Sequence, residues 1–109
     1  MLIDFSFKNI RSFKDEVTFS MEVGEGITDY AEDNTISSGE IDVVKSSFIF
    51  GGNASGKTNV IRAFQLLRQV VVYGTPSELD LLPVDTFAGV YGNTYFKIRF
   101  SKNKKIYDY

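Results

Sequence analysis

Residues 47–58 read SFIFGGNASGKT, and this stretch decides most of what can be expected of the fold. Residues 51–58 fit the pattern G-x-x-x-x-G-K-[ST] at every constrained position. The apolar run 47–50 before the pattern predicts a buried strand, and the amphipathic segment from Lys57 to about Tyr73 predicts a helix. Strand, glycine-rich loop and helix, in this order, are the context in which the pattern is a phosphate-binding P-loop.

Each part of this loop has a chemical reason to be there. Gly51 and Gly56 are expected to take positive φ, so that the backbone can approach phosphate oxygens. Successive N–H groups then form a nest for an anion, and the helix that follows presents its positive dipole end to the same phosphates. Lys57 is expected to reach the β- and γ-phosphates, and the Thr58 hydroxyl to ligate Mg²⁺. The predicted phosphate-binding residues are Gly51, Gly52, Asn53, Ala54, Ser55, Gly56, Lys57 and Thr58.

The alternative for residues 51–58 is an ordinary turn rich in Gly, Ser and Asn, with Lys57 merely solvated. A turn between a strand and a helix does not require lysine followed by threonine, so the phosphate-binding interpretation is favoured.

Composition excludes several classes of function. With 109 residues the chain is one domain or part of one, and 43% hydrophobic residues suffice for a core. A net charge of -2 provides no global basic field for nucleic acid. The absence of Cys and His excludes disulfides, thiolate and imidazole metal ligands, and Ser-His-Asp catalysis. No apolar run approaches a membrane span, so we expect a cytoplasmic protein without membrane contact.

The first part of the chain shows the period of β-structure. Apolar residues alternate with polar ones over 3–7 and over 17–23, which predicts two strands that pair as an antiparallel hairpin around a turn at 9–12. Residues 24–40 are rich in Gly, Ser, Asp and Glu and predict a loop. Residues 41–44 predict a short strand.

The segment after the loop has helical periodicity. Its apolar stripe recurs at Val60, Phe64, Leu67 and Val71, and is widened by Ile61, Ala63 and Val70. Gly74 and Pro76 are typical of a helix stop, and residues 75–92 predict a linker. Alternation over 94–100 predicts a strand, with a turn at 101–104 and a partner strand from 105 to 109. The lysines at 102, 104 and 105 then belong to a solvated hairpin turn and not to a DNA contact.

A Ras-like GTPase is a weaker alternative. Residues 81–89 look like an apolar strand ending in D-x-x-G, but the spacing is one residue too long and Pro83 would interrupt a central strand. Asn103-Lys104-Lys105 starts the guanine-reading pattern N-K-x-D, yet Ile106 takes the place of the carboxylate.

The N-terminus supports a different group of P-loop proteins. The segment MLIDFSFKNIRSFK at 1–14, followed by GGNASGKTN at 51–59, resembles the N-terminal half of bacterial "AAA family" ATPases with ABC-type heads, related to OLD, RecF and SMC proteins. The resemblance covers residues 1–73 and extends loosely over 93–109. It implies an α/β fold, a P-loop NTPase of ABC/SMC-like type with an antiparallel β subdomain. Residues 1–109 would be the N-terminal part of one head domain.

The resemblance also implies ligands and partners. These are ATP, Mg²⁺, and a head that forms a homodimer around two ATP molecules, with DNA a possible partner through the parent protein. Matched by position, Asn59 extends the phosphate loop, while Arg11, and less strongly Ser12, lie where the first β-turn approaches the nucleotide. An arginine can pair bidentately with phosphate, which gives this position of Arg11 a physical basis.

Parts of such an ATPase are missing from the sequence. No apolar strand ends in Asp-Glu, no Ser-Gly-Gly signature loop occurs, and there is no histidine; Asp80 and Asp85 follow apolar residues only in a proline-interrupted segment. No catalytic residue beyond Lys57 is therefore expected in the chain. We expect the N-terminal half of an ATP-hydrolysing head, possibly in DNA handling or phage defence, that associates with a missing C-terminal half. The alternative is a non-catalytic module for nucleotide binding or oligomerisation.

Overall fold

The computed structural model describes residues 1–26, 29–37, 39–74, 84–89 and 92–109. They form two compact units. The first unit comprises Met1–Ser6, Thr18–Ile49 and Lys97–Tyr109, and the second comprises Phe7–Val17 and Phe50–Phe96.

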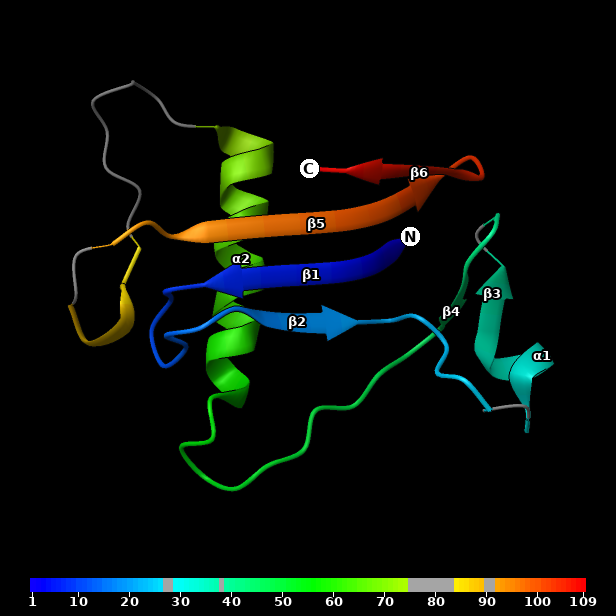
Figure 1. Cartoon of the computed structure of the whole chain (residues 1–109), viewed down its shortest axis with the longest axis horizontal. Coiled ribbons are helices and arrows are strands. Elements are labelled where there is room, and N and C mark those ends of the chain that lie inside the picture. The colour runs from blue at the N-terminus through cyan, green and yellow to red at the C-terminus, as the bar shows by residue number, and fades with distance from the viewer. Residues whose placement is uncertain (27–28, 38, 75–83, 90–91) are drawn as a thin grey trace. The chain divides into compact units, whose positions relative to one another are not determined.

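The strands follow one another in pairs along the chain, with helices between the pairs (Figure 1). In order they are β1 (Leu2–Lys8), β2 (Val17–Ser20), α1 (Ala31–Asn34), β3 (Thr35–Ser37), β4 (Asp42–Val44), α2 (Lys57–Tyr73), the 3₁₀ turn η1 (Phe87–Gly89), β5 (Tyr95–Lys102) and β6 (Lys105–Asp108). One sheet has the strand order β2-β1-β5-β6, and a second consists of β3 and β4. The predicted strands over 3–7, 41–44 and 94–100 and the predicted helix over 57–73 are confirmed.

The first unit contains most of the four-stranded sheet, and its central strand β1 has two chemically different faces. Ile3 and Phe5 are fully buried, whereas Asp4 between them lies on the opposite, polar face. This is the two-residue period of a strand, in which successive side chains point to opposite sides. The alternation that predicted the strand therefore also predicted which side chains form the core.

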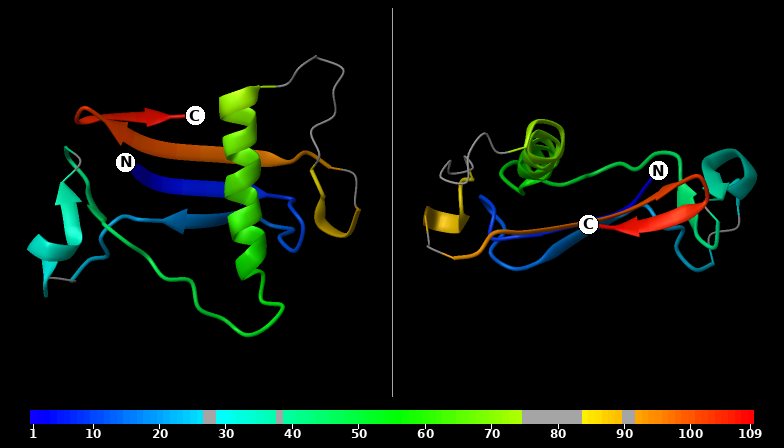
Figure 2. Two further views of the ribbon diagram at one scale, coloured as in Figure 1. Left: turned by 180° about the vertical axis from the view of Figure 1, so that it is seen from behind. Right: turned by 90° about the horizontal axis from the view of Figure 1, so that it is seen from above.

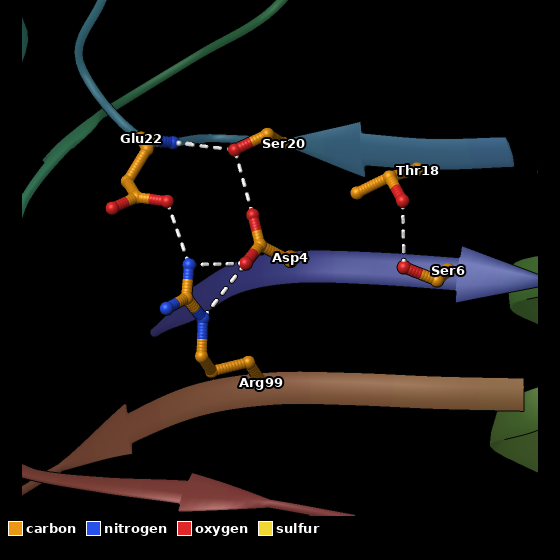
Figure 3. A network of polar contacts seen from close by, with 6 residues as sticks. All are labelled: Asp4, Ser6, Thr18, Ser20, Glu22 and Arg99. Atoms are coloured by element: carbon orange, nitrogen blue, oxygen red, sulfur yellow. Dashed lines mark hydrogen bonds and ion pairs between the residues drawn. The ribbon is translucent and has the colours of Figure 1, made fainter.

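The polar face of this sheet is held by a network around Arg99 (Figure 3). The Nε of Arg99 donates to Oδ2 of Asp4 at 2.7 Å, and Nη2 donates to Oε2 of Glu22 at 2.6 Å. Ser20 Oγ donates to the other Asp4 oxygen at 2.7 Å. Burial opposes the charge on Arg99, but the hydrogen bonds and negative charges of Asp4 and Glu22 outweigh it and raise the pKa of Arg99. The network links side chains of β1, β2 and β5 and of the residue Glu22 after β2, and so helps to fix how these strands are aligned.

The β5–β6 hairpin confirms the expected turn. Lys102 pairs with Lys105, and the two residues between them, Asn103 and Lys104, have φ of 54° and 61°. Two consecutive left-handed residues are the signature of a type I′ turn, whose twist suits a two-residue hairpin. Lys104 is thus a turn residue, while Lys102 and Lys105 are the strand residues that flank the turn.

The predicted loop over 24–40 was partly wrong. Its described part contains α1 and β3, while residues 27–28 and 38 lie outside the described residues. Ile36 of β3 pairs with Val43 of β4, which is fully buried. A single apolar residue in a polar segment has no detectable period, so only the cross-strand partner reveals this strand.

The second predicted strand also ends earlier than expected, because β2 stops at Ser20 and not at residue 23. Met21 still donates its N–H to Ile3 of β1 at 2.8 Å, but it accepts from Val44 at 2.8 Å. Glu22 then forms a bridge with Val43. The chain therefore changes its pairing partner from β1 to β4 at this point.

In the second unit, α2 has the predicted bounds but a narrower buried face. Ala63 and Leu67 are buried, whereas Ile61 and Val71 are 53% and 60% exposed, so their assignment to the buried stripe was wrong. At 3.6 residues per turn Ile61 points away from the Ala63–Leu67 line, and Val71 lies in the last turn beyond the buried part. Gly74 ends the helix with φ of 65° and donates its N–H to Val70, as predicted for a stop.

The predicted linker over 75–92 is described only in part. Residues 75–83 and 90–91, which include Pro76, Asp80 and Pro83, lie outside the described residues. Residues 87–89, in the described part, form the 3₁₀ turn η1.

Candidate functional site

The loop 51–58 leads directly into the first turn of α2, as the views in Figure 2 show. Lys57 is the first residue of the helix, and its ammonium group lies over the loop. It donates to the carbonyl oxygens of Gly51 and Gly52 at 2.6 Å each and to Ser55 Oγ at 3.3 Å. No carboxylate pairs with Lys57 within the described part of the chain. A positive charge held over exposed backbone groups, without a counter-ion, suits an anionic ligand.

Gly56 is required at the end of the loop for two reasons. Its φ of 92° is a left-handed conformation that side chains disfavour. A Cβ at this position would also lie 3.0 Å from Phe13 Cζ and 3.1 Å from Ser12 Oγ. The expected positive φ of Gly56 is therefore confirmed.

The expected positive φ of Gly51 was wrong, because Gly51 is not among the glycines with positive φ. Its lack of a side chain matters for space instead, since a Cβ there would lie 2.5 Å from Ser55 Oγ. The second left-handed residue of the loop is Ala54, with φ of 62°. Residues 51–55 are exposed to solvent, so the loop is open to a ligand.

The first turn of α2 has the properties of an anion site. Gly56 caps it without a side-chain hydrogen bond, and no acidic residue lies in the first turn. Its N–H groups and positive dipole end are thus not neutralised by the chain itself. Thr58 is exposed and offers a hydroxyl beside Lys57. Within the described residues no group of three or more His, Cys, Asp or Glu side chains could hold a metal ion.

The turn after β1 contacts the end of the loop. Asn59 Nδ2 donates to Ser12 Oγ at 2.9 Å, and Phe13 lies against Gly56. The Phe13 ring also packs edge-on against Phe7, with ring centroids 5.1 Å apart. The structure therefore brings Ser12 and Asn59, both expected near the nucleotide, to the P-loop.

Arg11 has a different partner in the structure. Its guanidinium pairs with Asp85 Oδ2 at 2.6 Å, and its backbone N–H donates to the Asp85 carbonyl at 2.7 Å. Asn9 binds the same stretch, accepting the N–H of Phe87 at 3.2 Å and the hydroxyl of Thr94 at 3.4 Å. Neither the pairing of Arg11 with Asp85 nor the hydrogen bonds of Asn9 were predicted. Their contacts join positions more than 70 residues apart, and no local pattern signals such a pair.

The strand expected at 47–50 was wrong. These residues belong to neither sheet, and Phe48 and Phe50 are 78% and 87% exposed. An apolar sequence forms a strand only when a neighbouring strand completes its hydrogen bonds. No strand in the described residues pairs with this segment.

A comparison with protein families gives a match that includes the P-loop. A family described as "AAA domain, putative AbiEii toxin, Type IV TA system" matches residues 46–108. The matched segment is more than half of the chain and runs from before the P-loop through α2 to β6. A search of curated proteins and a search of solved structures each found no match. No helix in the described residues is long and apolar enough to cross a membrane.

Proposed function

The chain belongs to this AAA domain family of P-loop ATPases, and we propose that it binds ATP and Mg²⁺ through residues 51–58. The observation that carries the proposal is the position of Lys57. Its ammonium group lies over an exposed loop at the N-terminus of α2, where no side chain caps the helix and no acidic residue lies in the first turn. Membership of this family indicates nucleotide binding in general. That the nucleotide is ATP, and which residue contacts which group, is what we propose in addition.

Each loop residue has a role in this proposal. The backbone N–H groups of Gly51, Gly52, Asn53, Ala54, Ser55 and Gly56 bind phosphate oxygens. Lys57 exchanges its carbonyl partners for the β- and γ-phosphates, because an ionised oxygen is the stronger acceptor. Thr58 holds Mg²⁺, and Asn59 is positioned by its hydrogen bond to Ser12. Arg11 stays a predicted contact, and the proposal does not rest on it, since its guanidinium pairs with Asp85.

In its finer form, the proposal is that the chain is the N-terminal part of an ABC/SMC-like ATPase head related to OLD and RecF proteins. Phosphoryl transfer needs groups that support Mg²⁺ and orient the attacking water, in addition to a P-loop. An Asp-Glu strand and a signature loop would come from a C-terminal half or a partner subunit, since neither occurs in this sequence. Closing of two heads around ATP would then drive work on DNA or in phage defence.

A non-catalytic nucleotide-binding or oligomerisation module is the second candidate. It is favoured by the lack of any apolar strand ending in Asp-Glu. Bound nucleotide would then serve association and not turnover.

Two assays on the 109-residue chain test these functions. Displacement of a fluorescent ATP analogue by ATP, GTP, CTP and UTP measures selectivity, and release of inorganic phosphate measures turnover. We expect ATP to compete best, with little turnover by the chain alone. Preference for GTP would contradict the ATPase assignment, and sustained Mg²⁺-dependent hydrolysis would contradict the non-catalytic module.

A further inference from the structure

A polar cavity lies beside α2 in the second unit. It has a volume of about 290 Å³, near the lower end for ligand pockets. Its walls come from one face of α2, from Ile10 and Arg11 of the turn, and from Asp85. The residues of α2 are Arg62, Gln65, Leu66 and Gln69. Their spacing of three and four residues places them on the same side of the helix. None of the lining residues belongs to the P-loop.

The charges in this cavity do not balance. Arg11 and Arg62 are both cationic, and Asp85 is the only acidic lining residue among those described. Asp85 is used by Arg11 at 2.6 Å, whereas no ion pair of Arg62 is found in the described residues. Each guanidinium carries five N–H donors, and the side-chain amides of Gln65 and Gln69 add more. The described lining residues are therefore rich in donors and together carry one positive charge in excess.

The ion pair between Arg11 and Asp85 indicates which kind of ligand this cavity can bind. The Asp85 carboxylate, with 66% of its side chain exposed, already places an oxygen on the Arg11 guanidinium. A carboxylate and a phosphate offer similar paired oxygens to the planar guanidinium fork, but phosphate carries more charge. Because Asp85 is exposed, a bound anion can replace it with little desolvation cost.

We propose that this cavity binds the phosphate group of a ligand between Arg11 and Arg62, and that Asp85 competes with the ligand for Arg11. The phosphate can be a monoester, as in a nucleotide, or a diester, as in a nucleic-acid backbone. None of residues 51–58 lines the cavity, so binding here can be measured with the P-loop lysine removed.

The test uses the whole chain carrying Lys57→Ala, which removes the lysine of the P-loop. Fluorescence anisotropy of labelled decathymidylate reports diester binding, and calorimetry with AMP reports monoester binding. Adding Arg62→Gln is expected to weaken binding about tenfold, the effect of losing one charge-assisted hydrogen bond. Adding Asp85→Asn is expected to tighten it severalfold, because the internal competitor loses its charge.

Arg68→Gln is the matched control. Arg68 is also an exposed arginine of α2 but does not line the cavity, so this change should leave binding within about twofold of the parent. The side chains of Arg62, Arg68 and Asp85 are all exposed, and unchanged far-UV circular dichroism will show that the variants fold. Binding of either probe with this mutational pattern supports the site and identifies the ester. Equal losses for Arg62→Gln and Arg68→Gln, or no binding of either probe at millimolar concentration, would overturn it.

Discussion

Substitution of Gly56 by alanine tests the geometry on which the nucleotide site depends. An alanine at φ of 92° would be forced into the left-handed region, at a cost of about 1–2 kcal/mol. Its Cβ would also lie 3.0 Å from Phe13 Cζ and 3.1 Å from Ser12 Oγ. Phe13 packs edge-on against Phe7, so moving its ring aside would disturb this contact, and the crowding adds about 1–3 kcal/mol. The expected loss of stability is thus about 2–5 kcal/mol, a large part of what a small domain has.

Gly52→Ala is the control within the same loop. A Cβ on Gly52 would meet no atom within 4 Å, and its φ is not positive, so this change should cost less than about 0.5 kcal/mol. Urea unfolding followed by circular dichroism gives both values, and titration with Mg²⁺-ATP gives the affinity of each variant. We expect Gly56→Ala to lose both stability and affinity and Gly52→Ala to retain its stability. Equal unfolding midpoints for the two variants would refute the packing of the turn against the loop.

Three further predictions concern other parts of the molecule. Arg99→Met leaves the half-buried Asp4 carboxylate without its cation and should lower the unfolding free energy in urea by about 1–3 kcal/mol. The control Lys97→Met should lower it by less than about 0.5 kcal/mol, and similar losses for both variants would argue against the network. Lys104→Gly should raise the unfolding free energy by about 0.5–1 kcal/mol, because glycine adopts the φ of 61° without strain, and a decrease would contradict the type I′ turn. Thr58→Ala should abolish the gain in ATP affinity that Mg²⁺ provides, so that titrations with Mg²⁺ and with EDTA agree; a persisting Mg²⁺ effect would exclude Thr58 as the ligand.

The sequence predicts the features whose signals are local. The helix over 57–73 has a periodic stripe, an N-terminal glycine and a C-terminal Gly74, and its bounds were confirmed. The turn residues Asn103 and Lys104 follow from alternation on both sides. The P-loop pattern is local too, because its glycines and its lysine lie within eight residues of one another.

The errors arise where distant partners decide the structure. Residues 47–50 look like a strand, yet no described strand supplies the hydrogen bonds that would make them one. Ile36 was assigned to a loop because its cross-strand partner Val43 cannot be seen in a local window. The ion pair between Arg11 and Asp85 was also not predicted, because it depends on how the chain folds back between them. The expected contact of Arg11 with the nucleotide stays a prediction.

Lys57 of the open P-loop is expected to bind the phosphates of ATP. Isothermal titration calorimetry with Mg²⁺-ATP on the unaltered chain, on Lys57→Ala and on Lys105→Ala tests it most directly. Lys105 is an exposed lysine of the β5–β6 hairpin and so controls for the loss of one positive charge. We expect Lys57→Ala to weaken ATP binding at least about tenfold, and Lys105→Ala to leave it unchanged. The same ATP affinity in all three proteins would show that Lys57 does not bind the phosphates of ATP.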